Sequence, residues 1–403
     1  MNIAPSFGNA LSNFDELILG QGNELSKRLH RHRLENFPPN AQKSLRSFQL
    51  SEAAGYLGIT AGHLKNLSLE GKGPEPAMTA TGRRSYSAEQ MLEMRHYLDK
   101  NGRSDVKKYV PHRRGNEHLQ IIAVVNFKGG SGKTTTAAHL SQHLALTGHR
   151  VLTMDLDPQA SLSALHGIQP EIDKDDSLYE ALRYDEYRKK LSQLIKSTNF
   201  PGLDIVPANL ELQAFEYDTP LVLAEKGTRE IGRVFFTRLD ESLSEIEKNY
   251  DVVVLDCPPQ LGYLTLTALS SATSVLITVH PQMLDVMSMC QFLLMLGEIL
   301  EPIRRGGGNM KLDWFRYLIT RYEPGDGPQG QMVEFLRSMF RNFVLQNSLL
   351  KSTAISDAGL TKQTLYEVER MQFTRSTYDR AMESLTSVNS EITSLVHQAW
   401  GRA

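Results

Sequence analysis

A glycine-rich loop at residues 127–132 holds the residues whose types and spacing best fit a chemical role. The apolar run Ile121–Val125 before it predicts a buried parallel strand, and the residues after it predict a helix that begins at Lys133. A strand, a glycine-rich loop and then a helix form the context of a phosphate site, because glycines let backbone N–H groups approach phosphates and the helix N-terminus adds its positive dipole end. The sequence therefore predicts that this loop binds nucleotide phosphates.

The side chains of the loop have separate expected roles. We expect Lys133 to neutralise charge on the β- and γ-phosphates and the Thr134 hydroxyl to ligate Mg²⁺. The residues expected to contact the nucleotide are Gly129, Gly130, Ser131, Gly132, Lys133, Thr134 and Thr135. A structural glycine turn without a ligand is the alternative, and the strand and helix on either side of the loop argue against it.

Two further apolar runs end in carboxylates. Val151–Met154 leads into two aspartates within residues 155–157, and Val252–Leu255 leads into Asp256. Each run predicts a buried strand, and ligands of open α/β sheets bind outside the carboxyl ends of the strands. We therefore expect these carboxylates beside the glycine-rich loop, in an α/β fold with a doubly wound, mostly parallel sheet.

The segment before the loop has the pattern of a winged helix-turn-helix. Two short helical stretches are separated by a turn at 58–60, with Ser51 as the expected cap of the first and Ala61 to Leu69 as the second. A basic stretch at 82–87 follows like a wing, and a third amphipathic stretch begins at Ala88.

In such a domain the second helix enters the major groove of DNA. Leu64 and Leu67 are expected to point inward, and the arginines of the wing are expected on phosphates. Asn66 is a candidate for reading a base. The residues expected nearest DNA are Lys65, Asn66, Arg83 and Arg84. A helical hairpin that only packs is the alternative interpretation.

Charge is distributed unevenly along the 403 residues. Residues 1–118 carry 17 Lys+Arg against 12 Asp+Glu, a balance of +5, whereas the remainder carries 27 against 34, a balance of −7. A basic front on an acidic body is typical of a nucleic-acid-binding appendage, although a solvated surface gives the same balance. Cys257 and Cys290 are too few for a disulfide framework or a zinc site. No signal peptide and no run of 18 apolar residues is apparent, so we expect a cytoplasmic protein with no membrane contact.

Three segments follow from these patterns. Residues 1–46 contain a predicted amphipathic helix, between about 11 and 36, which needs a partner surface on its own body or on a second subunit. Residues 47–118 form the expected winged helix-turn-helix region, with a polar linker at 103–118. Residues 119–403 form the expected nucleotide-binding domain.

One departure from the usual GxxxxGK[ST] pattern is informative: Phe127 stands where the first glycine would be, followed by Lys128. KGGSGKTTT resembles the deviant Walker A motif of the ParA/MinD/nitrogenase-iron-protein group. VLTMDLDPQASLS at 151–163 resembles the second motif of ParA, and YDVVVLDCPPQLG at 250–262 resembles its Walker B motif. The resemblance covers about residues 119–300 and is strongest to the large plasmid partition ATPases, in particular those of repABC plasmids.

The resemblance implies ATP/ADP and Mg²⁺ as cofactors and assigns further roles. Lys128 corresponds to the signature lysine that reaches the nucleotide of a partner subunit, and Asp157 to the residue that orients the attacking water. Asp155 lies near the magnesium shell in the family, and Asp256 holds magnesium through water. In the family the stretch that contains Pro281 and Gln282 helps to hold the adenine.

The resemblance implies a DNA-binding ATPase that segregates plasmid copies and represses its own operon. Its expected partners are a second copy of the chain, a ParB-type centromere-binding protein, operator DNA and nonspecific DNA, and its expected place is the bacterial nucleoid. A nucleotide-sensing repressor without a transport role is the alternative hypothesis. Lys128 and Asp157 favour hydrolysis, because a pure sensor would need neither.

Overall fold

The computed structural model describes residues 14–36, 43–79, 82–102, 108–168, 177–225, 235–305 and 311–402. The chain divides into two compact units, Met1–Lys43 and Ser44–Ala403. Parts of the three expected segments, including residues 103–107 of the linker, lie outside the described residues. The first unit contains helix α1 (Phe14–Asn36), within the range that the sequence predicts. Phe14, Ile18 and Leu25 of this helix are exposed.

The second unit begins with a small helical part, residues 44–102, which we call the winged domain after the predicted wing at 82–87; its identity as a winged helix-turn-helix stays a prediction. Its elements are β1 (Phe48–Gln49), α2 (Leu50–Leu57), α3 (Ala61–Leu69), β2 (Ala77–Met78), β3 (Arg84–Tyr86) and α4 (Ala88–Asn101). The three strands form an antiparallel sheet in the order β1-β3-β2. Gly58 ends α2 at φ +68°, a left-handed conformation that suits glycine, and the Thr60 side chain caps α3 by accepting from His63 N–H. The predicted cap Ser51 was wrong, because α2 begins at Leu50, so Gln49 is the N-cap residue and Ser51 lies inside the first turn.

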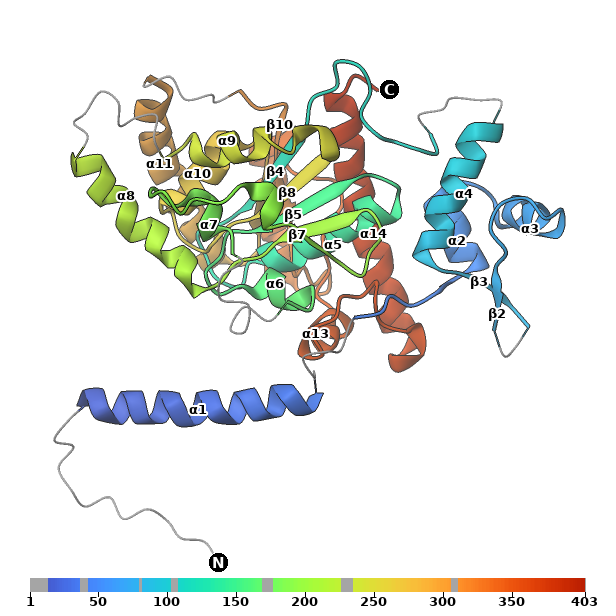
Figure 1. Cartoon of the computed structure of the whole chain (residues 1–403), viewed down its shortest axis with the longest axis horizontal. Helices are drawn as coiled ribbons and strands as arrows, with labels where there is room; N and C mark the ends of the chain where they lie inside the picture. The colour runs from blue at the N-terminus through green and yellow to red at the C-terminus, as the bar shows by residue number, and fades with distance from the viewer. Residues whose placement is uncertain are drawn as a thin grey trace, which may run out of the picture. The chain divides into compact units, whose positions relative to one another are not determined.

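A seven-stranded sheet forms the centre of the larger domain (Figure 1). Its strand order is β10-β9-β4-β8-β5-β7-β6, and all pairs are parallel except β6 with β7. The strands are β4 (Gln120–Val125), β5 (Val151–Asp155), β6 (Lys196–Ser197), β7 (Leu203–Val206), β8 (Val252–Asp256), β9 (Ser274–Val279) and β10 (Trp314–Ile319). The predicted doubly wound, mostly parallel α/β fold is therefore confirmed.

Helices cover both faces of this sheet (Figure 1). Ile121 and Ala123 of β4 belong to one apolar core and Ile122 and Val124 to the other, because successive side chains of a strand point to opposite faces. The helices are α5 (Lys133–Leu146), α6 (Ser161–Leu165), α7 (Tyr179–Leu182), α8 (Ala214–Glu225), α9 (Arg238–Ser244), α10 (Tyr263–Ser271), α11 (Met283–Arg305), α12 (Gly327–Phe340), α13 (Thr353–Leu360) and α14 (Arg375–Ala399).

The winged domain packs on the sheet domain through α4 and α5. Arg95 of α4 is buried, and its guanidinium donates to the carbonyls of Tyr109 and Leu146, each at 3.1 Å, and also to that of Tyr56. Since Leu146 is the last residue of α5, Arg95 closes the carboxyl end of that helix. The edge of the Tyr56 ring faces His143 of α5, with ring centroids 6.4 Å apart.

The described part of the predicted linker, residues 108–118, is held against the sheet domain. Arg402 donates to both Glu117 carboxylate oxygens, at 2.6 and 2.9 Å, and to the carbonyls of Pro111 and His112. The backbone N–H of Arg113 donates to the buried Asp251 carboxylate at 2.9 Å. These contacts fix the path of the chain between the two domains.

Helix α11 is the one helix in the described ranges that is long and apolar enough to cross a membrane, over Met283–Pro302. Asp285, Glu298 and Glu301 interrupt this apolar stretch, and only 22% of it is buried. Phe292 packs in the core, whereas Leu284 is 70% exposed. This length and composition do not distinguish a membrane span from a core helix of a water-soluble protein, which can have both.

Candidate nucleotide-binding site

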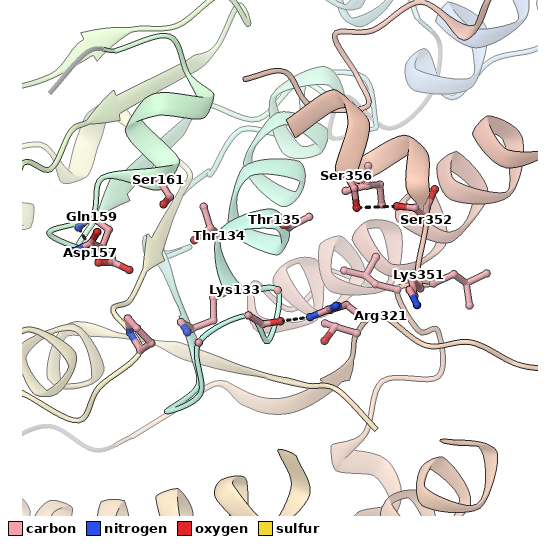
Figure 2. A pocket seen from close by; sticks show the side chains of 18 residues that line it. Lys133, Thr134, Thr135, Asp157, Gln159, Ser161, Arg321, Lys351, Ser352 and Ser356 are labelled. Carbon is pink, nitrogen blue, oxygen red and sulfur yellow. Dashed lines mark hydrogen bonds between the residues drawn. The ribbon is translucent and has the colours of Figure 1, made fainter. Parts of the chain in front are cut away.

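A cavity of about 550 Å³ lies at the carboxyl edge of the sheet, beside the residues that follow β4, β5, β8 and β10. Figure 2 shows the side chains that line it. This volume falls within the range of about 300–1,000 Å³ for small-molecule sites. It is lined by Gly129, Gly130, Gly132, Lys133, Thr134, Thr135, Asp157, Gln159, Ser161, Pro259, Thr320, Arg321, Leu349, Leu350, Lys351, Ser352, Ile355 and Ser356. Most of the residues predicted to bind the nucleotide phosphates therefore surround one cavity.

The loop before α5 has the backbone that phosphate binding requires. Gly130 and Gly132 have φ of +76° and +87°, so a side chain at either position would be strained. The carbonyl of Ser131 accepts from the Thr320 hydroxyl at 2.7 Å, and its side chain hydroxyl accepts from Thr278 at 3.0 Å. Ser131 is thus turned toward the sheet, and its backbone N–H is left for a phosphate.

Lys133 begins α5 and is buried. In the described part of the chain its ammonium makes a single hydrogen bond, at 3.2 Å, to the carbonyl of Lys128. Burial lowers the pKa of Lys133, and the nearby Asp256 carboxylate opposes this shift. A buried ammonium with one long hydrogen bond has N–H donors left over, and these are suited to bind phosphate oxygens.

Asp256 ends β8 and is fully buried. Among the described residues no hydrogen-bond donor meets bonding geometry with either of its carboxylate oxygens. Burial and then the neighbouring Asp155 raise its pKa, while the Thr134 hydroxyl and Lys133 oppose the shift. A buried carboxylate beside a hydroxyl fits Mg²⁺, which takes oxygen ligands and keeps several waters. Thr134 and Asp256 therefore have the oxygen groups that Mg²⁺ takes, and their role as its ligands stays a prediction.

Asp155 and Asp157 differ although they are two residues apart. Asp155 is fully buried, and its oxygens accept from Asp157 N–H at 3.1 Å and from the N–H and hydroxyl of Ser163, both at 2.8 Å. Burial raises its pKa to about 7. Asp157 lines the cavity and accepts from Gln159 N–H at 2.9 Å. Asp157 is thus open to the cavity, whereas Asp155 is held within the loop. The role of Asp157 in orienting the attacking water and the place of Asp155 near magnesium stay predictions.

Lys128 does not line the cavity. Its ammonium lies 2.7 Å from a carboxylate oxygen of Asp285 in the first turn of α11. Its backbone N–H donates to Asn126 Oδ1 at 2.9 Å. Lys128 therefore contacts its own subunit in this structure, and its predicted reach into a partner subunit stays a prediction.

Pro281 and Gln282 line a second cavity, between the start of α11 and α12, and they do not line the first. Their predicted contact with adenine stays a prediction. Sequence reasoning missed Thr320 and Arg321, which follow β10, and the segment 349–356. The rule that ligands bind at the carboxyl ends of parallel strands could have found the first two. No sequence signal indicates the segment 349–356.

The predicted DNA-binding residues lie on one small domain. Lys65 and Asn66 of α3 are exposed, and Leu64 and Leu67 are buried, as predicted. In the wing, Arg83 is exposed. Arg84 is half-buried, and its Nε donates to the Ser68 hydroxyl on α3 at 3.3 Å.

Known proteins resemble this chain over most of its length. A sequence profile described as an AAA domain matches residues 119–306. The putative replication protein A of Sinorhizobium fredii is 67% identical over 389 residues, which cover 96% of this chain and 95% of that relative. The chromosome partitioning protein ParA of Myxococcus xanthus is 30% identical over 239 residues, 59% of this chain and 77% of the relative.

A solved structure of cobyrinic acid a,c-diamide synthase from Mycobacterium smegmatis, with bound ATP analog and magnesium, is similar with a TM-score of 0.50 and 27% identity. The similarity covers 60% of this chain and 91% of that one. The sheet, the glycine-rich loop and the cavity define a P-loop NTPase. The chain belongs to the ParA-type family of partition ATPases, so the resemblance predicted from the motifs is confirmed.

Proposed function

We propose that this chain is an ATP-hydrolysing, DNA-binding partition protein. It would segregate plasmid copies together with a ParB-type centromere-binding protein and repress its own operon. The observation that carries the proposal is the buried Asp256 carboxylate, with which no donor among the described residues meets bonding geometry, near Lys133, which lines a cavity of about 550 Å³. A site that leaves a carboxylate and an ammonium both under-satisfied is suited to a ligand that carries anionic phosphates and a cation.

The residues divide the chemistry between them. The N–H groups of the loop and Lys133 would hold the phosphates, and Thr134 with Asp256 would hold Mg²⁺, which neutralises charge that develops on the phosphate oxygens. Asp157, at the cavity wall, would orient the attacking water. Lys128 would reach the nucleotide of a second subunit. The ATP analog and magnesium in the structure of the related synthase support ATP and Mg²⁺ as cofactors.

The remaining parts of the proposal concern macromolecules. ATP would bring two copies of the chain together, with the helix in residues 1–46 as an additional dimerisation element. Residues 47–118 would bind the operator, and residues 119–403 would form the ATPase domain. The dimer would also hold nonspecific DNA through phosphate contacts and so remain on the nucleoid in the cytoplasm.

ATPase turnover tests this proposal. We expect slow hydrolysis by the chain with Mg²⁺-ATP, and stimulation when DNA and the cognate centromere-binding protein are both added. Asp157→Ala should retain ATP binding and lose turnover, because only the position of the water changes. Turnover that DNA and the partner protein leave unchanged would contradict a role in partition.

A nucleotide-sensing repressor is the second candidate function. Exposed Lys65 and Asn66 on α3, together with the wing, favour operator binding. The two functions are distinguished by hydrolysis: a repressor that only senses nucleotide would bind its operator equally well in wild type and in Asp157→Ala at any time after ATP is added. For a partition ATPase, operator binding by the wild type would diverge from operator binding by Asp157→Ala as the wild type consumes ATP.

A further inference from the structure

Lys128 and Asp285 form an ion pair within one subunit. The Lys128 ammonium lies 2.7 Å from Asp285 Oδ2, and the two side chains are 39% and 9% exposed. Asp285 lies in the first turn of α11, where its backbone N–H donates to the carbonyl of Gln282. The carboxylate is therefore a nearly buried anion whose charge Lys128 compensates.

A second basic group near Asp285 does not replace Lys128. His280 Nδ1 is 3.9 Å from Asp285 Oδ1, beyond hydrogen-bond distance. Burial lowers the pKa of His280, so the imidazole is neutral at neutral pH. In the described part of the chain, Lys128 is thus the charged partner within 4 Å of this carboxylate.

The position of Lys128 is also linked to the phosphate loop. Its backbone N–H is held by Asn126, whose side-chain amide in turn donates to the Thr278 carbonyl of β9. Its carbonyl accepts from Lys133 at 3.2 Å. A nucleotide that draws Lys133 toward its phosphates would break this last bond, so loading of the site changes the surroundings of Lys128 directly.

We infer that Asp285 is a positioning residue that holds Lys128 in its own subunit until an ATP-bound partner competes for it. The inference rests on the proposed function, in which Lys128 reaches the nucleotide of the second subunit. Lys128 cannot contact Asp285 and a distant phosphate at once, so dimer closure requires the ion pair to break. The apparent dimer affinity then scales with the fraction of subunits whose lysine is released, so a small released fraction means weak dimerisation.

Asp285→Asn tests this inference, because it keeps the shape of the side chain and removes its charge. With Mg²⁺ and a non-hydrolysable ATP analogue, we expect the dimer dissociation constant to fall on the order of tenfold, measured by sedimentation or light scattering over a concentration series. ATP affinity of the monomer should stay within about threefold of wild type, since Asp285 lies outside the cavity. Glu301→Gln is the matched control, since it removes an exposed acid from the same helix. That variant should dimerise like wild type.

The double variant Lys128→Ala/Asp285→Asn distinguishes positioning from a change in folding. Its dimer constant should equal that of Lys128→Ala alone, because the gain from Asp285→Asn acts only through the lysine. A dimer of Asp285→Asn that is as weak as wild type, or weaker, would overturn the inference. If Lys128→Ala alone dimerises as tightly as wild type, the proposed contact of Lys128 with the nucleotide of the second subunit is wrong instead.

Discussion

Arg95 and Lys133 are both buried cations in the same unit, but their surroundings differ. Arg95 is 3% exposed and donates to three backbone carbonyls, on residues 56, 109 and 146. Lys133 is 6% exposed and has one hydrogen bond, at 3.2 Å, within the described residues. Burial lowers the pKa of both groups, that of Arg95 to about 10.

The difference separates a structural cation from a binding one. A buried charge is costly unless hydrogen bonds satisfy it, and removal of one partner leaves the others unpaired. Arg95 meets this requirement inside the protein, so it joins two domains. Lys133 does not, so its remaining donors are suited to an external anion. The two residues should therefore respond to substitution in opposite ways.

The largest expected effect is on stability, from Arg95→Ala. Three carbonyls would lose their donor at the junction of the winged and sheet domains, and the free energy of unfolding should fall by about 3 to 5 kcal/mol. Denaturant unfolding measures this change. His96→Ala removes an exposed neighbour on the same helix and should stay within about 0.5 kcal/mol of wild type. A loss of unfolding free energy below about 1 kcal/mol for Arg95→Ala would contradict the structural role that separates Arg95 from Lys133.

Lys133→Ala should have the next largest effect, on ligand affinity. ATP affinity should fall at least about 100-fold, because an ammonium beside the phosphates is lost. Stability without nucleotide should be unchanged or higher, since a poorly satisfied buried charge is removed. Calorimetric titration and unfolding of the nucleotide-free protein check both parts. Undiminished ATP affinity would contradict the assignment of the phosphate loop.

Asp256→Asn should have a smaller, pH-dependent effect. Burial raises the pKa of Asp256, and that of Asp155 to about 7, so the folded chain binds more protons than the unfolded chain above about pH 4. Stability should therefore fall as pH rises toward 7 and beyond. The variant lacks one of these carboxylates, so we expect it to exceed wild type by about 1 to 2 kcal/mol at pH 8 and by less at pH 5. Urea unfolding measures both proteins at both pH values. A stability difference between variant and wild type that is the same at pH 5 and pH 8 would refute this.

The smallest effect is expected for an exposed cation, Arg83 of the wing. Arg83→Ala should reduce the slope of operator affinity against salt concentration by about one unit, as one phosphate contact is lost. Arg84→Ala should change affinity more than the slope, because Arg84 also joins the wing to Ser68 of α3. Filter binding over a salt series compares them, with Lys100→Ala on α4 as control. If operator affinity has the same slope against salt concentration in all three variants, Arg83 does not contact a phosphate.

Much of the phosphate site could be predicted from the sequence because its signals are local. Ile121–Val125, the glycines of the loop and Lys133 follow one another within 13 residues, and each restricts the structure of the next. The inward Leu64 and Leu67 and the exposed Lys65 and Asn66 likewise follow from the helical period alone.

Contacts between distant segments could not be predicted in this way. The sequence around Arg95 indicates only an amphipathic helix, and the three carbonyls that it meets come from residues 56, 109 and 146. Asp155 and Asp157 look equivalent in the motif, but the N–H and hydroxyl of Ser163 both donate to Oδ2 of Asp155. Arg321, which follows β10, lines the cavity and donates to the Gly130 carbonyl at 3.0 Å, although the two residues are 191 positions apart in the sequence.

The contact of Arg402 with the inter-domain segment has a consequence for the order of events during translation. Glu117 precedes its partner Arg402 by 285 residues. At a synthesis rate of about 5 to 20 residues per second, the segment at 111–117 emerges from the ribosome on the order of 15 to 60 seconds before that arginine exists. The winged domain can therefore fold early, but its attachment through this segment is completed only after Arg402, 285 residues further along the chain, has been synthesised.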